Sequence, residues 1–99
     1  ARSYAERANE LAPDTPEIQD TLARLLLAEG ATERALGLLE AALEGGSDSP
    51  AIRLHFAEAL IAAGAQERGL AELDQVLAQV EAGQLRAEAE ALKARTEGL

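Results

Sequence analysis

The sequence predicts an all-α fold, a solenoid of antiparallel helix pairs that ends in a capping helix. Three observations support this prediction: a period of 34 residues, apolar residues at helical spacing, and a composition rich in alanine and leucine. A fixed period in this range is typical of solenoids, in which each repeat buries its apolar face by stacking on a neighbour. Alanine and leucine are the strongest apolar helix formers, whereas the β-branched residues that favour strands are scarce here.

Two copies of the repeat, residues 16–49 and 50–83, are found when the chain is aligned with itself at an offset of 34 residues. In this alignment 12 of the 34 residue pairs are identical. The identical pairs include Pro16 with Pro50 at the start and Gly30 with Gly64 near the middle. Because the shared residues lie at starts, turns and apolar positions, they define a structural unit.

Turn residues divide each copy into two helices. Thr15 and Ser49 are good N-caps, and the proline that follows each of them suits the first helical position. Gly30 and Gly64 permit the left-handed conformation that ends a helix. Between these signals, apolar residues recur every three or four positions. The predicted helices span residues 16–29, 33–44, 50–63 and 67–81.

A single predicted helix lies on each side of the two copies. Residues 1–12 align with the second helix of a repeat, because the offset of 34 places Ala1 on Ala35 and Ala8 on Ala42. We interpret them as the second helix of a truncated repeat, and the chain as part of a longer protein. Residues 84–97 are predicted to form a capping helix. A solenoid needs such a cap with a polar outer side to stay soluble.

The residues of the two copies resemble the tetratricopeptide repeat. That motif has an aromatic residue, Leu-Gly and Tyr in its first helix, Ala and Phe in its second, and a closing proline. The first copy reads Gln19-x-x-Leu22-Ala23-x-x-Leu26, then Ala35-x-x-x-Leu39 and Ala42; the second reads Arg53-x-x-Phe56-Ala57-x-x-Leu60, then Gly69-x-x-x-Leu73 and Val76. The resemblance covers nearly the whole chain and is strongest to C-terminal repeats of bacterial members. It implies a right-handed α-α superhelix.

Small residues at some motif positions predict where helices pack closely, and polar residues at others depart from the motif. The resemblance places Ala23 and Ala57 where the two helices of a repeat cross, and Ala35 and Gly69 where neighbouring repeats pack closest. A larger side chain there would overpack the contact. The chain departs from the motif at the aromatic position, which holds Gln19 and Arg53, and at the closing proline, which is replaced by Ser47 and Glu81.

Few residues could support catalysis. His55 is the only histidine, and a general base would need a nucleophile and an orienting group within hydrogen-bond reach. Ser47 and Ser49 are explained as turn and cap residues. The chain has no cysteine, and Gly45-Gly46 lacks the lysine of a phosphate loop. We therefore expect no enzymatic activity, no cofactor and no metal site.

The charge of the chain limits its partners. The formal net charge is −9, so an acidic surface should repel nucleic acids and anionic membranes. No stretch approaches the roughly 20 apolar residues that span a bilayer. We expect a soluble protein, cytoplasmic or periplasmic. The acidity is explained by a solvated helical surface, by a basic partner, or by a saline environment.

The resemblance implies a binding surface. In the family, the first helices of successive repeats line a concave groove that holds a peptide or protein segment. The residues expected to line it here are Glu17, Asp20, Arg24, Leu27, Leu54, Glu58, Ile61, Glu88 and Leu92, with Ala62, Leu85 and Arg95 beside them. Three of them, Leu27, Leu54 and Ile61, are expected off the core face. The prediction is a shallow apolar strip rimmed by carboxylates, suited to a segment with apolar and basic side chains.

Two functions stay open at this point. The first is a protein-interaction module of the kind just described. The second is a structural spacer or self-association segment of a larger protein, because the helix at residues 1–12 lacks a partner helix. Two copies could cover that apolar side mutually and form a homodimer.

Overall fold

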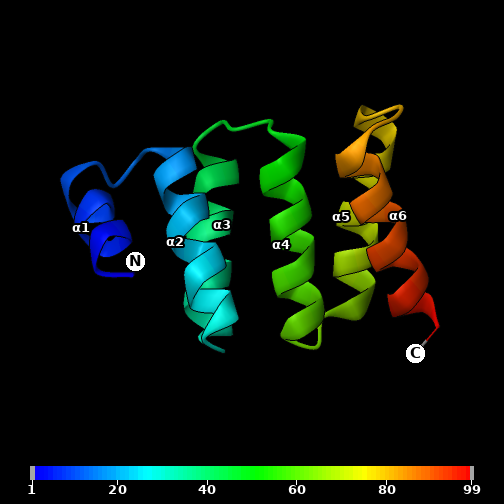
Figure 1. Cartoon of the computed structure of the whole chain (residues 1–99), viewed down its shortest axis with the longest axis horizontal. Helices are drawn as coiled ribbons and strands as arrows, with labels where there is room; N and C mark the ends of the chain where they lie inside the picture. Colours follow the sequence, from blue (N-terminus) through cyan, green and yellow to red (C-terminus); the bar gives the residue numbers. More distant parts are fainter. Residues whose placement is uncertain (1, 99) are drawn as a thin grey trace. The chain divides into compact units, whose positions relative to one another are not determined.

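A computed structural model places residues 2–98, and all six of the helices described there follow the order expected (Figure 1). Ala1, which the predicted first helix included, lies outside the described residues. The helices are α1 (Arg2–Leu11), α2 (Pro16–Ala28), α3 (Thr32–Glu44), α4 (Pro50–Ala62), α5 (Gln66–Gln79) and α6 (Gln84–Glu97). Residues 2–98 contain no strand. The all-α fold class is therefore confirmed.

The same closing turn ends α2 and α4. Gly30 and Gly64 adopt the left-handed conformation, with φ of 86° and 90°. Beyond each glycine, a backbone N–H donates back into the helix, from Ala31 to the carbonyl of Leu26 and from Ala65 to that of Leu60, both at 2.8 Å. These bonds satisfy carbonyls that a helix end leaves unpaired. The turns send α3 and α5 back antiparallel to the helices before them (Figure 1).

The chain forms two compact units that divide after Asp48. In the first unit, α2 packs along α3, and α1 packs against α2. The buried apolar residues of this unit are Ala5, Leu22, Ala23, Leu26, Ala35, Leu39 and Ala42. The core is thin because alanines let the helices approach closely.

In the first unit a polar residue occupies the aromatic position of the repeat motif. Gln19 is buried, and its Nε2 donates to the backbone oxygen of Pro13 at 2.8 Å. The bond joins α2 to the connection that precedes it and satisfies a carbonyl at the same time. A buried amide with such a partner is tolerated, whereas an unpaired one would be costly.

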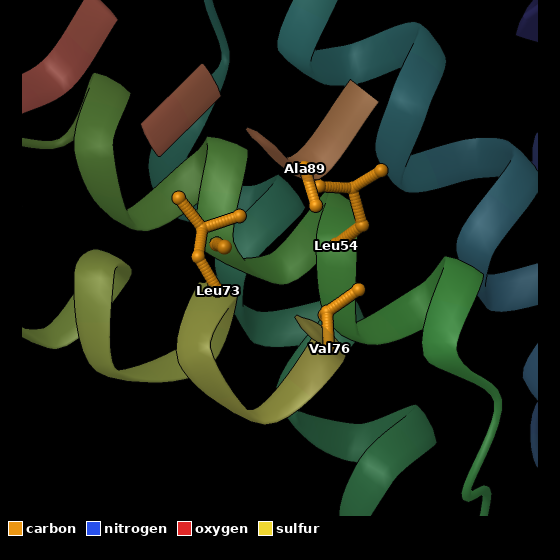
Figure 2. Packing of buried hydrophobic residues seen from close by; sticks show 5 residues of the cluster. Leu54, Leu73, Val76 and Ala89 are labelled. Carbon is orange, nitrogen blue, oxygen red and sulfur yellow. The ribbon is translucent and has the colours of Figure 1, made fainter. Parts of the chain in front are cut away.

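In the second unit, α4, α5 and α6 pack around one apolar cluster. Leu54, Ala57, Leu73, Val76 and Ala89 are fully buried in it. Figure 2 shows four of these side chains converging from the three helices. Partly buried residues pack around the cluster: Ile61, Leu70, Leu77, Val80, Leu85 and Leu92. The core of this unit therefore depends on all three helices.

The backbone of α5 lies close to α4 at Gly69. A Cβ atom built there would lie 2.6 Å from Ile61 Cγ1 and 3.2 Å from the backbone oxygen of Ala57. The expectation that Gly69 lies between neighbouring repeats is wrong, because it packs against the helix that directly precedes α5. The expected position of Ala57 at the crossing of the two helices agrees with this contact.

Arg53, the second residue at the aromatic position, also has a polar partner. Its Nη1 donates to Glu72 Oε1 at 2.6 Å and links α4 to α5. Both side chains are mostly shielded from water, so the pair is less screened than one on the surface. Arg53 Nε is buried without a hydrogen-bond partner.

Polar side chains also attach α6 to α5. Arg86 Nη1 donates to the carbonyl oxygens of Leu77 at 2.9 Å and of Val80 at 2.7 Å. Lys93 Nζ donates to Asp74 Oδ1 at 2.9 Å, and this carboxylate raises the pKa of Lys93. The α5 helix ends at Gln79, two residues before the predicted end, because Val80 adopts an extended conformation. The Arg86 guanidinium thus binds carbonyls that the early helix end exposes.

Replacing Arg86 by alanine is expected to lower the free energy of unfolding by about 1–2 kcal/mol, since the C-terminal carbonyls of α5 lose a charged donor. Urea unfolding followed by circular dichroism measures the change. Arg24→Ala is the matched control, because Arg24 is exposed in the middle of α2. Its effect should stay within about 0.5 kcal/mol. Equal effects of the two substitutions would contradict the capping role of Arg86.

Candidate functional site: the outer faces of α2 and α4

The outer face of α2 is polar and open to solvent. Glu17 and Arg24 are exposed, and Asp20 and Leu27 are half-buried. These residues follow one another at spacings of three, four and three, which places them on one side of the helix. Leu27 is thus the single large apolar side chain among the predicted groove residues of the first unit.

On α4 the structure corrects one of the predicted groove residues. Leu54 was expected off the core face, but it is 0% exposed and belongs to the apolar cluster of the second unit. The cause is that Leu73 and Val76 of α5 and Ala89 of α6 lie in the same cluster (Figure 2). A peptide cannot reach Leu54 without opening the core.

Ile61 also contributes to packing. It is half-buried, packs against the apolar cluster and lies next to Gly69. Glu58, three residues earlier on the same side of α4, is half-buried, and Ala62 is exposed. The face that α4 offers to a partner is therefore a carboxylate beside small and partly covered apolar groups.

On α6 the predicted groove residues divide in the same way. Leu85 and Leu92 pack against the apolar cluster, whereas Glu88 and Arg95 are exposed. Glu88 Oε1 accepts a hydrogen bond from Gln84 Nε2 at 3.1 Å. The apolar members of the predicted set thus serve mainly the core, and the charged members form the accessible surface.

One carboxylate on each of the two outer faces has no basic partner. Within residues 2–98, neither Glu17 on α2 nor Glu58 on α4 forms an ion pair with a basic side chain. The net charge of −9 adds to the negative potential around them. A surface of this kind attracts cationic groups more strongly than apolar ones.

Other kinds of site find little support. His55, half-buried on α4, is the one histidine of the chain. Among the described residues, no cluster of three acidic or histidine side chains is arranged to hold a metal ion. No helix in the same part of the chain is both long and apolar enough to cross a bilayer.

The paired helices, their closing turns and the 34-residue period agree with a comparison against protein families. A family model described as tetratricopeptide repeat matches residues 26–96, which is more than half of the chain. The chain belongs to the tetratricopeptide repeat family. No protein with a curated description matches the sequence. Tetratricopeptide repeats are generally protein-interaction modules, and the family is a non-catalytic one.

Sequence reasoning missed the polar partners of the motif residues in this tetratricopeptide chain. Gln19 and Arg53 were recognised only as departures from the aromatic position, although each forms a buried or half-buried polar contact. One signal was present for the second of them. At the offset of 34, Glu72 replaces Leu38 where Arg53 replaces Gln19, so the two differences are of opposite charge.

Proposed function

We propose that this chain is a non-catalytic binding module, and that the outer face of α2 in the first unit and that of α4 in the second can each hold a basic segment of another protein. The observation that carries the proposal is the set of uncompensated carboxylates, Glu17 and Glu58, on the first helices of the two predicted repeats. Family membership supports a binding role in general. The concave groove that would join these faces remains a prediction, as do the partition into repeats and the identity of the partner.

The physical basis of binding is preorganisation together with charge. Each face belongs to a helix that its own unit holds by core packing, so the ordering entropy falls mainly on the partner. The carboxylates on these faces speed up the association with a cationic segment and repel acidic segments. Apolar contacts of limited extent, from Leu27 on α2 and from Ile61 and Ala62 on α4, add buried surface area beside the charges. Affinity should therefore fall as salt concentration rises.

Reversing the charge of Glu58 tests the proposal. Peptides are first selected from a displayed random library on the intact chain, and affinities are then measured by calorimetry. We expect the selected peptides to be rich in Lys and Arg, and Glu58→Arg to weaken their binding by about tenfold or more. Glu81→Arg is the matched control, since Glu81 is exposed on the connection between α5 and α6.

The control gives three readable outcomes. A loss confined to Glu58→Arg supports the α4 face as the binding surface. An equal loss in Glu81→Arg would mean that only the overall charge matters, which contradicts a defined site. Selected peptides that lack basic residues, or that bind both variants unchanged, would contradict the proposal and favour a spacer role.

A further inference from the structure

The outer face of α2 carries one acidic and one basic side chain that have no ionic partner. Glu17 and Arg24 are both exposed, and within the described part of the chain neither forms an ion pair. They lie on the same side of the helix, about 10.5 Å apart along its axis. Leu27 lies on this side too, one turn beyond Arg24. Asp20, between the two charges, is half-buried and has an interaction of its own.

The aligned face of α4 does not repeat this pattern of charges. At the offset of 34, Arg24 aligns with Glu58, and Glu17 aligns with Ala51. The second unit therefore presents a carboxylate where the first unit presents a guanidinium. A purely basic segment suits α4, but on α2 it would be repelled at Arg24. A segment that suits α2 should carry a negative charge as well as a positive one.

We infer that the α2 face binds a helical segment of another protein that carries an acidic and a basic residue seven positions apart. This inference rests on the proposed function and specifies the partner of the first unit. The acidic residue pairs with Arg24 and the basic residue with Glu17. Both pairs form together, because seven residues of a partner helix rise by the same distance of about 10.5 Å.

The separation of the two charges favours a helix over an extended segment. Residues on one side of an extended segment are about 6.6 or 13 Å apart, since every second side chain points the same way. Neither distance matches the separation of Glu17 and Arg24 as closely as the helical one does. The guanidinium of Arg24 can bind a carboxylate through two parallel hydrogen bonds, so correct placement of the acidic residue strengthens the contact.

The helix dipole favours a partner that runs antiparallel to α2. Acidic residues are stabilising near the N-terminus of a helix and basic residues near its C-terminus. A stable partner helix therefore has its acidic residue first and its basic residue second. Such a helix must run antiparallel to place these residues opposite Arg24 and Glu17. An apolar residue three positions before the acidic one then lies opposite Leu27, which adds an apolar contact.

Two synthetic peptides of the same composition test this inference. Each has about 20 residues in an alanine-rich, helix-forming background. The first carries Leu, then Glu three residues later and Lys seven residues after that; the second has Glu and Lys exchanged. Fluorescence anisotropy measures their affinities for the intact chain. The wild type should bind the first about fivefold more tightly, because the exchange turns two exposed ion pairs into two repulsions.

Reversing the charges on α2 should reverse this preference. The double variant Glu17→Arg with Arg24→Glu keeps the net charge of the chain, so only the order of the charges changes. Both residues are exposed, and circular dichroism checks that the helical content is kept. The variant should bind the second peptide more tightly than the first. An unchanged preference, or equal binding of the two peptides by the wild type, would overturn the inference.

A pair on α6 provides the matched control. Glu88 and Arg95 are exposed and have the same spacing as Glu17 and Arg24. This pair differs because Glu88 already accepts a hydrogen bond from Gln84, and Gly98 stands three residues beyond Arg95 in place of a leucine. The double variant Glu88→Arg with Arg95→Glu should keep the preference of the wild type. A reversal in this variant would place the peptide on α6 and overturn the inference.

A spin label gives a second measurement on the wild type. A nitroxide at the C-terminus of the first peptide should lie near the start of α2 if the peptide runs antiparallel. The amide signals of Glu17 and Ile18 should then broaden more than those of Leu27 and Ala28 in nuclear magnetic resonance spectra. The opposite gradient, or broadening confined to α4, would overturn the inference.

The inference and the proposed function can fail separately. Basic peptides from the displayed library that bind through Glu58 would support the proposed function. If the two synthetic peptides then bound equally or not at all, only the inference would be overturned. If no peptide of either kind bound the intact chain, both would be overturned.

Discussion

Replacing Leu54 by alanine is expected to lower the free energy of unfolding by about 2–5 kcal/mol, the usual cost of emptying a fully buried leucine site. Leu54 is 0% exposed and shares its cluster with residues of α5 and α6. The substitution removes apolar contacts with both helices and leaves a cavity that the alanines around it cannot fill. A small domain holds a total stability of about 5–15 kcal/mol, so the loss is a large fraction of it.

Urea unfolding followed by circular dichroism at low chain concentration measures this effect. Leu11→Ala makes the same chemical change at a side chain that is 76% exposed, so it should alter stability by at most about 0.5 kcal/mol. If the two substitutions had similar small effects, Leu54 would be accessible, as the sequence suggested. Leu54→Asp is expected to unfold the second unit, because it would bury an unpaired charge.

Introducing leucine at Gly69 is expected to cost about 3 kcal/mol through overpacking. Even the first added atom would lie 2.6 Å from Ile61 Cγ1 and 3.2 Å from the backbone oxygen of Ala57. The Ile61 side chain can rotate away from the added atom. The backbone oxygen of Ala57 can move away only if α4 and α5 separate. Such a movement would also stretch the Arg53–Glu72 pair, whose atoms are 2.6 Å apart.

Gly37 provides the matched control for Gly69. It lies inside α3, as Gly69 lies inside α5, but no atom lies within 4 Å of a Cβ built there. Gly37→Leu should therefore stabilise the chain by up to about 1 kcal/mol, because leucine has the higher helix propensity. Thermal or urea unfolding of the two variants should give changes of opposite sign. Changes of the same sign would contradict the close contact at Gly69.

A double substitution tests which atoms cause the cost. In the first unit the aligned pair is Leu27 with Ala35, so that unit accepts a Cβ where the second has none. With Ile61 present, Gly69→Ala should lower the free energy of unfolding, because the new Cβ would clash with Ile61 Cγ1. Combined with Ile61→Leu, the cost should shrink, and the double-mutant cycle should show a favourable interaction energy.

Most of the fold could be predicted because its signals are local and repeated. Proline restricts the backbone at a helix start and glycine permits the left-handed conformation beyond a helix end. Accordingly α2 and α4 begin at Pro16 and Pro50 as predicted, and α6 begins at residue 84, after Gly83, as predicted. The 34-residue offset then placed the remaining helices. The end of α5 was misjudged, because the extended Val80 and the Arg86 donor depend on α6 rather than on local sequence.

The candidate site was less predictable, because exposure depends on which helix covers which side. Leu54 aligns with the half-buried Asp20, and residues of both α5 and α6 cover this side of α4. The change from a carboxylate to a leucine at one repeat position was the available signal. This change marks a difference in burial, from the half-buried Asp20 to the fully buried Leu54. The charged residues Glu17 and Glu88 were placed on the surface, where the structure has them.

The pairing of helices that follow one another in the chain has a kinetic consequence. The tightest contacts join α2 to α3 and α4 to α5, across turns of a few residues. Little loop-closure entropy must then be spent before a contact forms. Topologies with such low contact order fold within about microseconds to milliseconds. A chain of this kind exposes Leu54, Leu73 and Val76 only briefly after synthesis, which leaves little time for aggregation.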